Sequence, residues 1–214
     1  MNKQKILMWL LAMIPLVGFM ACSETNESEE EYGNWQQRND AYFTDIYATA
    51  AANADGKWKI LNNYTYNDSI DPGANHCIVV HVEEQGTGSG CPMYTDSVEV
   101  SYRGRLIPSA SYADGYVFDQ TYTGDFDWKT SGVSRFFISS LVDGFTTALQ
   151  NMHIGDRWKV YVPYDLGYGT SAYKVIPGYS TLVFDIALRA YYRPDTDQIG
   201  TRAAGALKGR WITE

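Results

Sequence analysis

The sequence predicts an α+β domain in which a sheet packs on one short helix and an amphipathic helix precedes the sheet. Three observations support this class. Short apolar and β-branched runs end at Gly, Pro, Asn or Asp, as strands do. One stretch among them has helical composition, and a longer stretch near the N-terminus spaces its apolar residues as a helix does. The 214 residues allow one domain with a sizeable core and appended segments.

The first predicted element is an amphipathic helix over residues 35–54. Its apolar residues recur at separations of three, four and seven, with no Gly or Pro between them. Asp55 and Gly56 end it, because this pair favours a turn. The predicted strands cover residues 76–82, 97–102, 158–162 and 181–191. A short helix over 144–152 lies between the second and third strands, with Leu149 and Met152 on one side and Gly155 after its end.

The N-terminus reads as a targeting segment rather than as part of the fold. Residues 1–21 carry two lysines and then an apolar run over 6–20, which is typical of a secretory signal and short for a membrane span of about 20 residues. Ala21 followed by Cys22 resembles the lipobox of bacterial lipoproteins. We therefore expect a lipid on Cys22 and an extracytoplasmic domain held at the outer membrane, on its periplasmic or cell-surface face. An uncleaved anchor and an ordinary secreted protein are the alternatives.

Charge and composition argue against nucleic acid as a partner. The chain has 25 acidic and 17 basic residues, a formal net charge of −8, and no cluster of Lys and Arg that a nucleic-acid backbone would need. Residues 22–31 are expected to form an acidic tether, since 23–31 contain no apolar residue to support folding. We expect no nucleic-acid binding.

The usual motifs for nucleophilic, metal and phosphate chemistry are absent from the sequence. His76, His81 and His153 lack the spacing of metal ligands, so neither a metal nor a cofactor is expected. A disulfide between Cys77 and Cys91 is possible in an exported protein, but two small buried residues are the favoured interpretation.

Aromatic residues make up 14% of the chain, and many of them cluster near Gly and Pro over residues 97–192. The clusters are SVEVSYRG at 97–104, GYVFD at 115–119, LVDGF at 141–145, MHIG at 152–155, VPYDLGYG at 162–169 and IPGYSTLVFD at 176–185. In this order they resemble the FKBP-type peptidyl-prolyl cis-trans isomerases. The last cluster is the most distinctive.

The resemblance implies an antiparallel half-barrel sheet wrapped on one short helix, with an aromatic hollow between them. The implied catalytic residues are Asp119, Tyr168 and Phe184. The implied substrate-binding residues are Tyr102, Phe118, Leu141, Val142, Phe145 and Ile176. Phe145 stands where the family usually has Trp, and Ser134 stands where an aromatic wall residue is common.

The implied reaction is rotation about an Xaa–Pro bond, which requires no nucleophile. A dry aromatic pocket disfavours the planar, dipolar amide relative to the twisted one. Under the resemblance, the Tyr168 hydroxyl or the Ile176 amide would hold the substrate carbonyl. Asp119 would polarise that carbonyl or orient Tyr102.

The expected function is therefore assistance to the folding of exported, proline-containing polypeptides. A non-catalytic FKBP-like module that only binds peptide or acts as a chaperone is the alternative. The expected organisation is a helical extension over 32–75, the isomerase domain over 76–193 and a tail over 194–214. The helix over 35–54 would either form a homodimer or cover the sheet.

Overall fold

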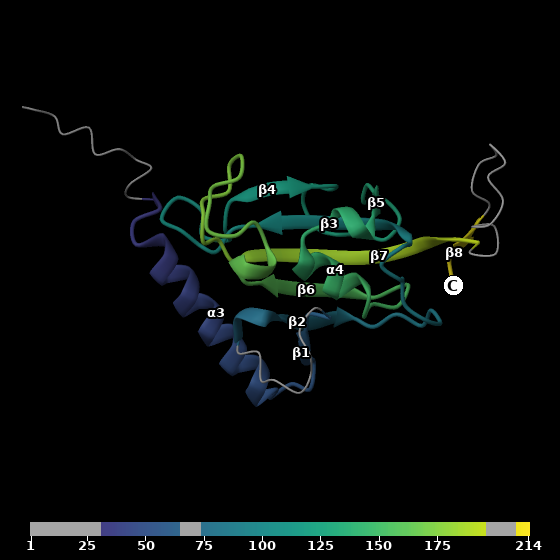
Figure 1. Ribbon diagram of the computed structural model, residues 1–214, viewed down its shortest axis with the longest axis horizontal. Helices are drawn as coiled ribbons and strands as arrows, with labels where there is room; N and C mark the ends of the chain where they lie inside the picture. Colours follow the sequence, from purple (N-terminus) through teal and green to yellow (C-terminus); the bar gives the residue numbers. More distant parts are fainter. Residues whose placement is uncertain (1–30, 65–73, 196–208) are drawn as a thin grey trace, which may run out of the picture.

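The computed structural model describes residues 31–64, 74–195 and 209–214. An antiparallel sheet forms its centre, with helix α4 on one face and the longer helix α3 packed beside strands β1 and β2 (Figure 1). The predicted α+β class, with one short helix on an FKBP-like sheet and a preceding helix, is confirmed.

The described elements run in the following order. They are α3 (Trp35–Ala52), β1 (Trp58–Asn62), β2 (Cys77–Glu84), β3 (Ser97–Arg105), β4 (Val117–Gln120), β5 (Ser134–Phe137), α4 (Asp143–Leu149), β6 (Arg157–Val162), β7 (Leu182–Pro194) and β8 (Gly209–Ile212). The sheet order is β1-β2-β6-β7-β3-β4, with β5 pairing β3 and β8 pairing β7. Short 3-10 turns lie at Ala74–His76, Ile138–Ser140 and Tyr164–Leu166.

Four strands were not predicted individually: β1, β4, β5 and β8. Three of them have four residues and β1 has five, so each is too short for an alternating pattern to stand out. Strand β7 also continues to Pro194, into the segment expected to be a tail. Each short strand forms by hydrogen bonding to a longer one: β1 pairs with β2, β4 and β5 pair with β3, and β8 pairs with β7.

Both faces of the sheet are covered, which explains its continuous apolar runs. In β2, Ile78 and Val80 join the core beneath α4, whereas Val79 between them packs with Phe43 of α3. All three β2 side chains have 0% exposure. Gly144 lets α4 approach the sheet closely, because a Cβ atom there would lie 2.2 Å from the side chain of Val162.

Helix α3 is fixed to its own domain by polar as well as apolar contacts. The Trp35 indole N–H donates to Ser180 Oγ at 2.9 Å. The fully buried Asn39 accepts from the backbone N–H of Thr181 at 2.7 Å. The helix ends at Asn53, a left-handed residue with φ of 43°. The structure thus shows the helix covering the sheet, one of the two roles expected for it.

Glu31, the last residue of the expected tether, packs against the domain. Glu31 is 8% exposed, and its carboxylate accepts hydrogen bonds from Ser109 Oγ and from the backbone N–H of Ser111. These bonds hold the pKa of Glu31 below its usual range. Glu31 is therefore part of the fold. Cys22 and the signal segment lie outside the described residues, among which no helix is long and apolar enough to cross a membrane.

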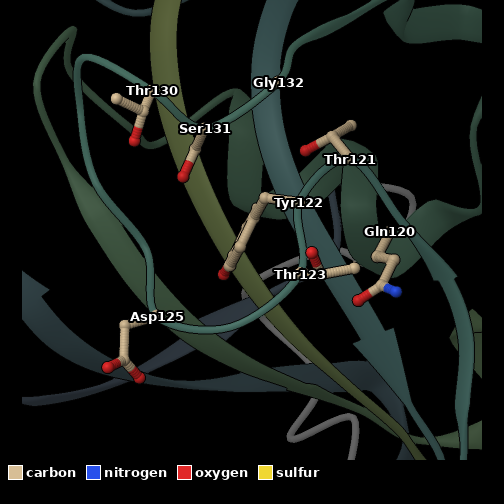
Figure 2. A pocket seen from close by; sticks show the side chains of 8 residues that line it. All are labelled: Gln120, Thr121, Tyr122, Thr123, Asp125, Thr130, Ser131 and Gly132. Atoms are coloured by element: carbon tan, nitrogen blue, oxygen red, sulfur yellow. The ribbon is translucent and has the colours of Figure 1, made fainter.

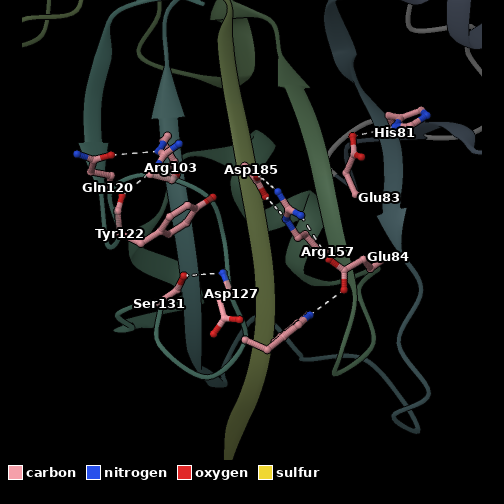
Figure 3. Close-up of polar contacts among 12 residues, drawn as sticks. His81, Glu83, Glu84, Arg103, Gln120, Tyr122, Asp127, Ser131, Arg157 and Asp185 are labelled. Carbon is pink, nitrogen blue, oxygen red and sulfur yellow. Dashed lines mark hydrogen bonds and ion pairs between the residues drawn. The ribbon is translucent and has the colours of Figure 1, made fainter.

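The loop over residues 121–132 covers the same sheet face as α3, beside β3 and β7. Arg103 of β3 donates to the carbonyl of Gly124 at 2.6 Å, and Arg189 of β7 donates to the carbonyl of Trp128. Figure 3 shows the neighbouring ion pairs, in which Arg157 contacts Asp185 at 2.6 Å and Glu84 at 3.3 Å. The pKa of Arg157 is raised by these contacts. The loop thereby covers the part of this face that carries Arg103, Arg157 and Arg189.

Candidate functional site

A hollow of about 230 Å³ lies on the α4 side of the sheet. Its walls come from strands β3, β4, β5 and β7, from the turn before α4, from α4 itself and from the loop after Tyr168. The lining residues are Tyr102, Phe118, Asp119, Phe136, Ser140, Leu141, Val142, Phe145, Tyr168, Tyr173 and Phe184. The structure thus brings together every predicted site residue of the hollow except Ile176.

Phe145 forms the floor of the hollow and packs on two walls. Its ring centroid lies 5.9 Å from that of Tyr102 and 5.0 Å from that of Phe184, both edge to face. Phe118 packs in the same way on Phe184, at 5.6 Å. Such edge-to-face pairs stabilise each other, so the walls are held in place before any ligand arrives.

Gly104 of β3 makes this arrangement possible, and sequence reasoning gave it no role. A Cβ atom at this position would lie 2.5 Å from the Phe118 ring and 2.8 Å from the Phe184 ring. Both rings therefore pack directly on the backbone of Gly104. Gly104 is the last residue of the SVEVSYRG cluster and follows the wall tyrosine Tyr102 by two residues, which is the signal that the sequence offers for its role.

The polar group of the hollow is the pair formed by Tyr102 and Asp119. The Tyr102 hydroxyl donates to Asp119 Oδ2 at 2.6 Å across the β3–β4 pair. Burial, together with this carboxylate, raises the pKa of Tyr102 well above its usual value. The hydroxyl therefore stays protonated at any physiological pH and holds one carboxylate oxygen in a fixed position.

Two stacked tyrosines form the rim. The Tyr168 and Tyr173 rings lie 4.5 Å apart and are nearly parallel, at 7°. Burial and the neighbouring Tyr173 raise the pKa of Tyr168, so its hydroxyl remains a hydrogen-bond donor. Tyr173 was not predicted, because the loop that carries it has no regular pattern.

The structure places Ile176 in the core rather than in the wall of the hollow. This residue is 4% exposed and belongs to the core, and it is not among the residues that line the hollow. Its backbone N–H already donates to the carbonyl of Tyr173 at 2.9 Å, and its own carbonyl accepts from the Tyr173 N–H at 2.9 Å. The Ile176 amide thus fixes the loop under Tyr173 and is not available to a substrate carbonyl.

The aromatic wall residue sought at Ser134 is Phe136. Both residues are in β5, where side chains two apart share a face. The Phe136 ring lies 5.7 Å from the Tyr102 ring, edge to face. Ser134 and Phe136 are on the same face of β5, and of the two only Phe136 lines the hollow.

A further hollow differs from this one in its lining. A hollow of about 430 Å³ within the loop over 121–132 is polar, as Figure 2 shows, and lacks an apolar wall. Its lining residues are Gln120, Thr121, Tyr122, Thr123, Asp125, Thr130, Ser131 and Gly132. In the described residues no group of three His, Cys, Asp or Glu side chains is arranged to hold a metal ion.

The remaining thiols do not form the disulfide that the sequence left open. Cys77 is buried at the start of β2, and Cys91 Sγ lies 3.9 Å from His153 Nε2. Burial raises the pKa of the Cys91 thiol, so this contact does not create a nucleophile at neutral pH.

A family model described as FKBP-type peptidyl-prolyl cis-trans isomerase matches residues 88–189. The matched region contains the whole aromatic hollow. This region of the chain belongs to the FKBP family. The FKBP-type region begins after β2, so α3, β1 and β2 precede the part that the model matches.

Individual relatives agree with this assignment. The chain is 39% identical over 105 residues to the macrophage infectivity potentiator of Trypanosoma cruzi, covering 49% of this chain and 47% of the relative. It is 36% identical over 138 residues to FkpA, an FKBP-type peptidyl-prolyl cis-trans isomerase of Escherichia coli, covering 61% of this chain and 45% of the relative. The chain therefore spans less than half the length of these FKBP-type relatives.

Among solved structures, the peptidyl-prolyl cis-trans isomerase of Pseudomonas syringae is similar to this chain, with 29% identity and a TM-score of 0.48. The similarity covers 70% of this chain and 92% of that protein.

Proposed function

We propose that this protein is a peptidyl-prolyl cis-trans isomerase that assists the folding of exported polypeptides. The observation that carries the proposal is the preformed hollow, in which edge-packed rings of Phe118, Phe145 and Phe184 surround the Tyr102–Asp119 hydrogen bond. Membership of the matched region in the FKBP family supports it.

The chemistry needs only such a hollow. Rotation about an Xaa–Pro bond has a barrier of about 18–20 kcal/mol and takes tens to hundreds of seconds. The planar amide has a larger dipole than the twisted amide, because twisting removes the resonance. An apolar wall therefore destabilises the ground state more than the transition state. A difference of ~6 kcal/mol would accelerate rotation by about 10⁴-fold.

In this proposal Asp119, Tyr168 and Phe184 have different roles. Asp119 holds the Tyr102 hydroxyl at 2.6 Å and thereby fixes the wall beside the proline. Tyr168 offers its hydroxyl to the substrate carbonyl, a role that the hydrogen-bonded Ile176 amide leaves to it. Phe184 provides the apolar surface against which the amide loses its hydration.

The deciding experiment measures cis/trans exchange of a Leu-Pro peptide by NMR with and without the protein. We expect exchange to accelerate in proportion to protein concentration. Peptide binding without acceleration would replace the isomerase with the alternative, a non-catalytic module that binds peptide or acts as a chaperone. Phe184→Leu, which keeps an apolar side chain, should bind peptide but accelerate exchange less.

The proposal includes a lipid anchor on Cys22 that holds the domain outside the cytoplasm, at the periplasmic or cell-surface face of the outer membrane. The lipobox-like Ala21-Cys22 pair supports it. So does the 40% identity over 106 residues to a Legionella longbeachae relative named outer membrane protein MIP. Mass spectrometry of the membrane fraction tests it, with Cys22→Ser expected to release the protein into the soluble fraction.

Helix α3 has the role of a cover in this proposal rather than that of a dimer contact. A homodimer through α3 would have to use its outward surface, where exposed positions carry polar or small side chains. These are Gln36, Gln37, Asp40, Ala41, Thr44, Asp45, Ala48, Thr49, Ala51 and Ala52. Such a surface lacks the large apolar side chains that stable interfaces bury. Sedimentation at increasing concentration distinguishes the two.

A further inference from the structure

A second apolar groove lies at the end of the sheet where β5 and β8 are found, far from α3 (Figure 1). Its volume is about 340 Å³, and its lining residues are Ser97, Arg135, Phe136, Phe137, Tyr192 and Trp211. Phe137 is 67% exposed and Trp211 is 41% exposed. Large aromatic side chains left in water at one place indicate a binding surface.

Strand register explains why these side chains meet. Phe137 of β5 pairs with Ser97 of β3, Ser97 pairs with Tyr192 of β7, and Tyr192 pairs with Trp211 of β8. Directly opposite residues of antiparallel strands share a face, so the four side chains form one row across the sheet. Ser97 is the small member, and the groove has its aromatic side chains on both sides of this serine.

Ring and cation contacts fix Trp211, at the β8 end of the row. The Tyr192 and Trp211 rings lie 5.6 Å apart, and the Arg135 guanidinium lies 4.8 Å above the Trp211 ring. Arg135 is itself paired with Glu99 at 2.8 Å. The groove therefore presents apolar ring surface with its adjacent cation already neutralised, which favours an apolar side chain over an acidic one.

The groove and the prolyl hollow lie on either side of β5 and share one lining residue, Phe136. Side chains alternate along β5, so Phe136 faces Tyr102 while Phe137 points to the other side. Within the described residues β5 pairs only with β3, which leaves it at the sheet edge. A polypeptide that leaves the hollow past Phe136 can therefore cross β5 and enter the groove.

We propose that this groove binds an aromatic or long aliphatic side chain of the same polypeptide whose proline occupies the hollow. The inference rests on the proposed function and extends it from the proline to the sequence around it. Three strand spacings make the row about 14 Å long, or about four extended residues. With the crossing of β5, the bound side chain should stand about five to eight residues from the proline. A second copy is the less favoured occupant, because the chain carries a net charge of −8.

Matched peptides test the proposal. Each of three fifteen-residue peptides contains one Leu-Pro bond. The first carries Phe six residues before the proline, the second carries Phe six residues after it, and the third carries Ala at both places. We expect one Phe peptide to show a KM about tenfold below that of the Ala peptide, a gain typical of a buried aromatic contact. Phe137→Ala and Trp211→Ala should each remove most of this difference and change kcat/KM for the Ala peptide by less than twofold.

The control is Tyr94→Ala, since Tyr94 is an exposed aromatic side chain (55%) that lines neither the groove nor the hollow. It should keep the full difference. Equal KM values for all three peptides, or a difference that survives in the Phe137→Ala/Trp211→Ala double variant, would overturn the proposal. So would a dimer that Phe137→Ala dissociates in sedimentation, because the groove would then be an interface between copies.

The same peptides separate this proposal from the proposed function. Fluorescence anisotropy of labelled peptides gives their dissociation constants without any catalysis. If no peptide is isomerised but the Phe peptide still binds about tenfold more tightly in a Phe137-dependent way, the groove stands and the isomerase does not. If all peptides are isomerised equally, the isomerase stands and the groove does not.

Discussion

The Tyr102 hydroxyl donates a 2.6 Å hydrogen bond to the carboxylate of Asp119 inside the aromatic hollow. The two residues come from β3 and β4, and Asp119 pairs with Gly104, two residues beyond Tyr102 on the same strand. The bond therefore joins the wall of the hollow to its only acidic lining residue. Its geometry favours one of the two roles expected for Asp119, which is to orient Tyr102.

A double-mutant cycle tests this role. Tyr102→Phe and Asp119→Asn should each lower kcat/KM for a Leu-Pro peptide by roughly threefold to tenfold, the range of one hydrogen bond. Because the two residues act as a unit, the double variant should lose little more than either single variant. Losses that multiply would show that Asp119 acts on the substrate carbonyl independently of Tyr102.

The second prediction concerns β5, where sequence comparison pointed to Ser134 and the structure points to Phe136. Phe136→Ala removes a wall that packs on Tyr102 at 5.7 Å, so kcat/KM should fall by about tenfold. Ser134→Ala is the matched control, since Ser134 is on the same strand but does not line the hollow, and should leave kcat/KM unchanged. A loss of kcat/KM in Ser134→Ala with none in Phe136→Ala would show that Ser134 contributes to the wall and Phe136 does not.

These two cases show how far the sequence predicted the site. Tyr102, Phe118, Phe145 and Phe184 lie on regular elements with short, distinctive clusters, and all of them line the hollow. Phe136 was missed because the preceding loop over 121–132 has no pattern that fixes the register of β5. Ile176 lies in the core, and a pair of loop hydrogen bonds joins it to Tyr173, which composition does not reveal.

In the fold, too, some elements could be predicted from the sequence and others could not. The helices were predicted because burial on one face imposes a period, and the long strands because burial on both faces gives a continuous apolar run. The short strands β4, β5 and β8 exist through pairing with β3 and β7, a tertiary effect. The burial of Asn39 could not be predicted from the sequence, because a polar residue on a helix gives no sign that it will be fully buried against Thr181.

The third prediction concerns the contribution of the buried Asn39 side chain to stability. Asn39→Leu removes the acceptor for the Thr181 N–H, which is buried with it, and an unsatisfied buried donor costs about 1–3 kcal/mol. The free energy of unfolding, measured by urea titration, should fall by that amount. Gln36→Leu, one turn away on the exposed side of α3, is the control and should have little effect. An unchanged stability of Asn39→Leu would mean that α3 does not depend on this contact.

The fourth prediction concerns the pH dependence of stability at His81. Its Nε2 lies 2.9 Å from Asp55 and its Nδ1 lies 3.0 Å from Glu83, so both nitrogens face acceptors and the protonated ring satisfies both. Figure 3 shows the contact with Glu83. Burial lowers the pKa of His81, but the hydrogen bonds to Asp55 and Glu83 outweigh it and raise the pKa above its usual value.

A raised pKa in the folded state means that the folded protein binds the proton more tightly than the unfolded chain. The stabilisation is therefore complete below the unfolded pKa of about 6.5 and is lost as pH rises through the folded pKa. The difference in unfolding free energy between wild type and His81→Gln should thus be largest near pH 5.5 and smallest near pH 8.5. Urea titrations at both pH values measure it. Asp55→Asn should reduce the pH dependence, whereas a difference that grows with pH would show that His81 is bound as the neutral ring.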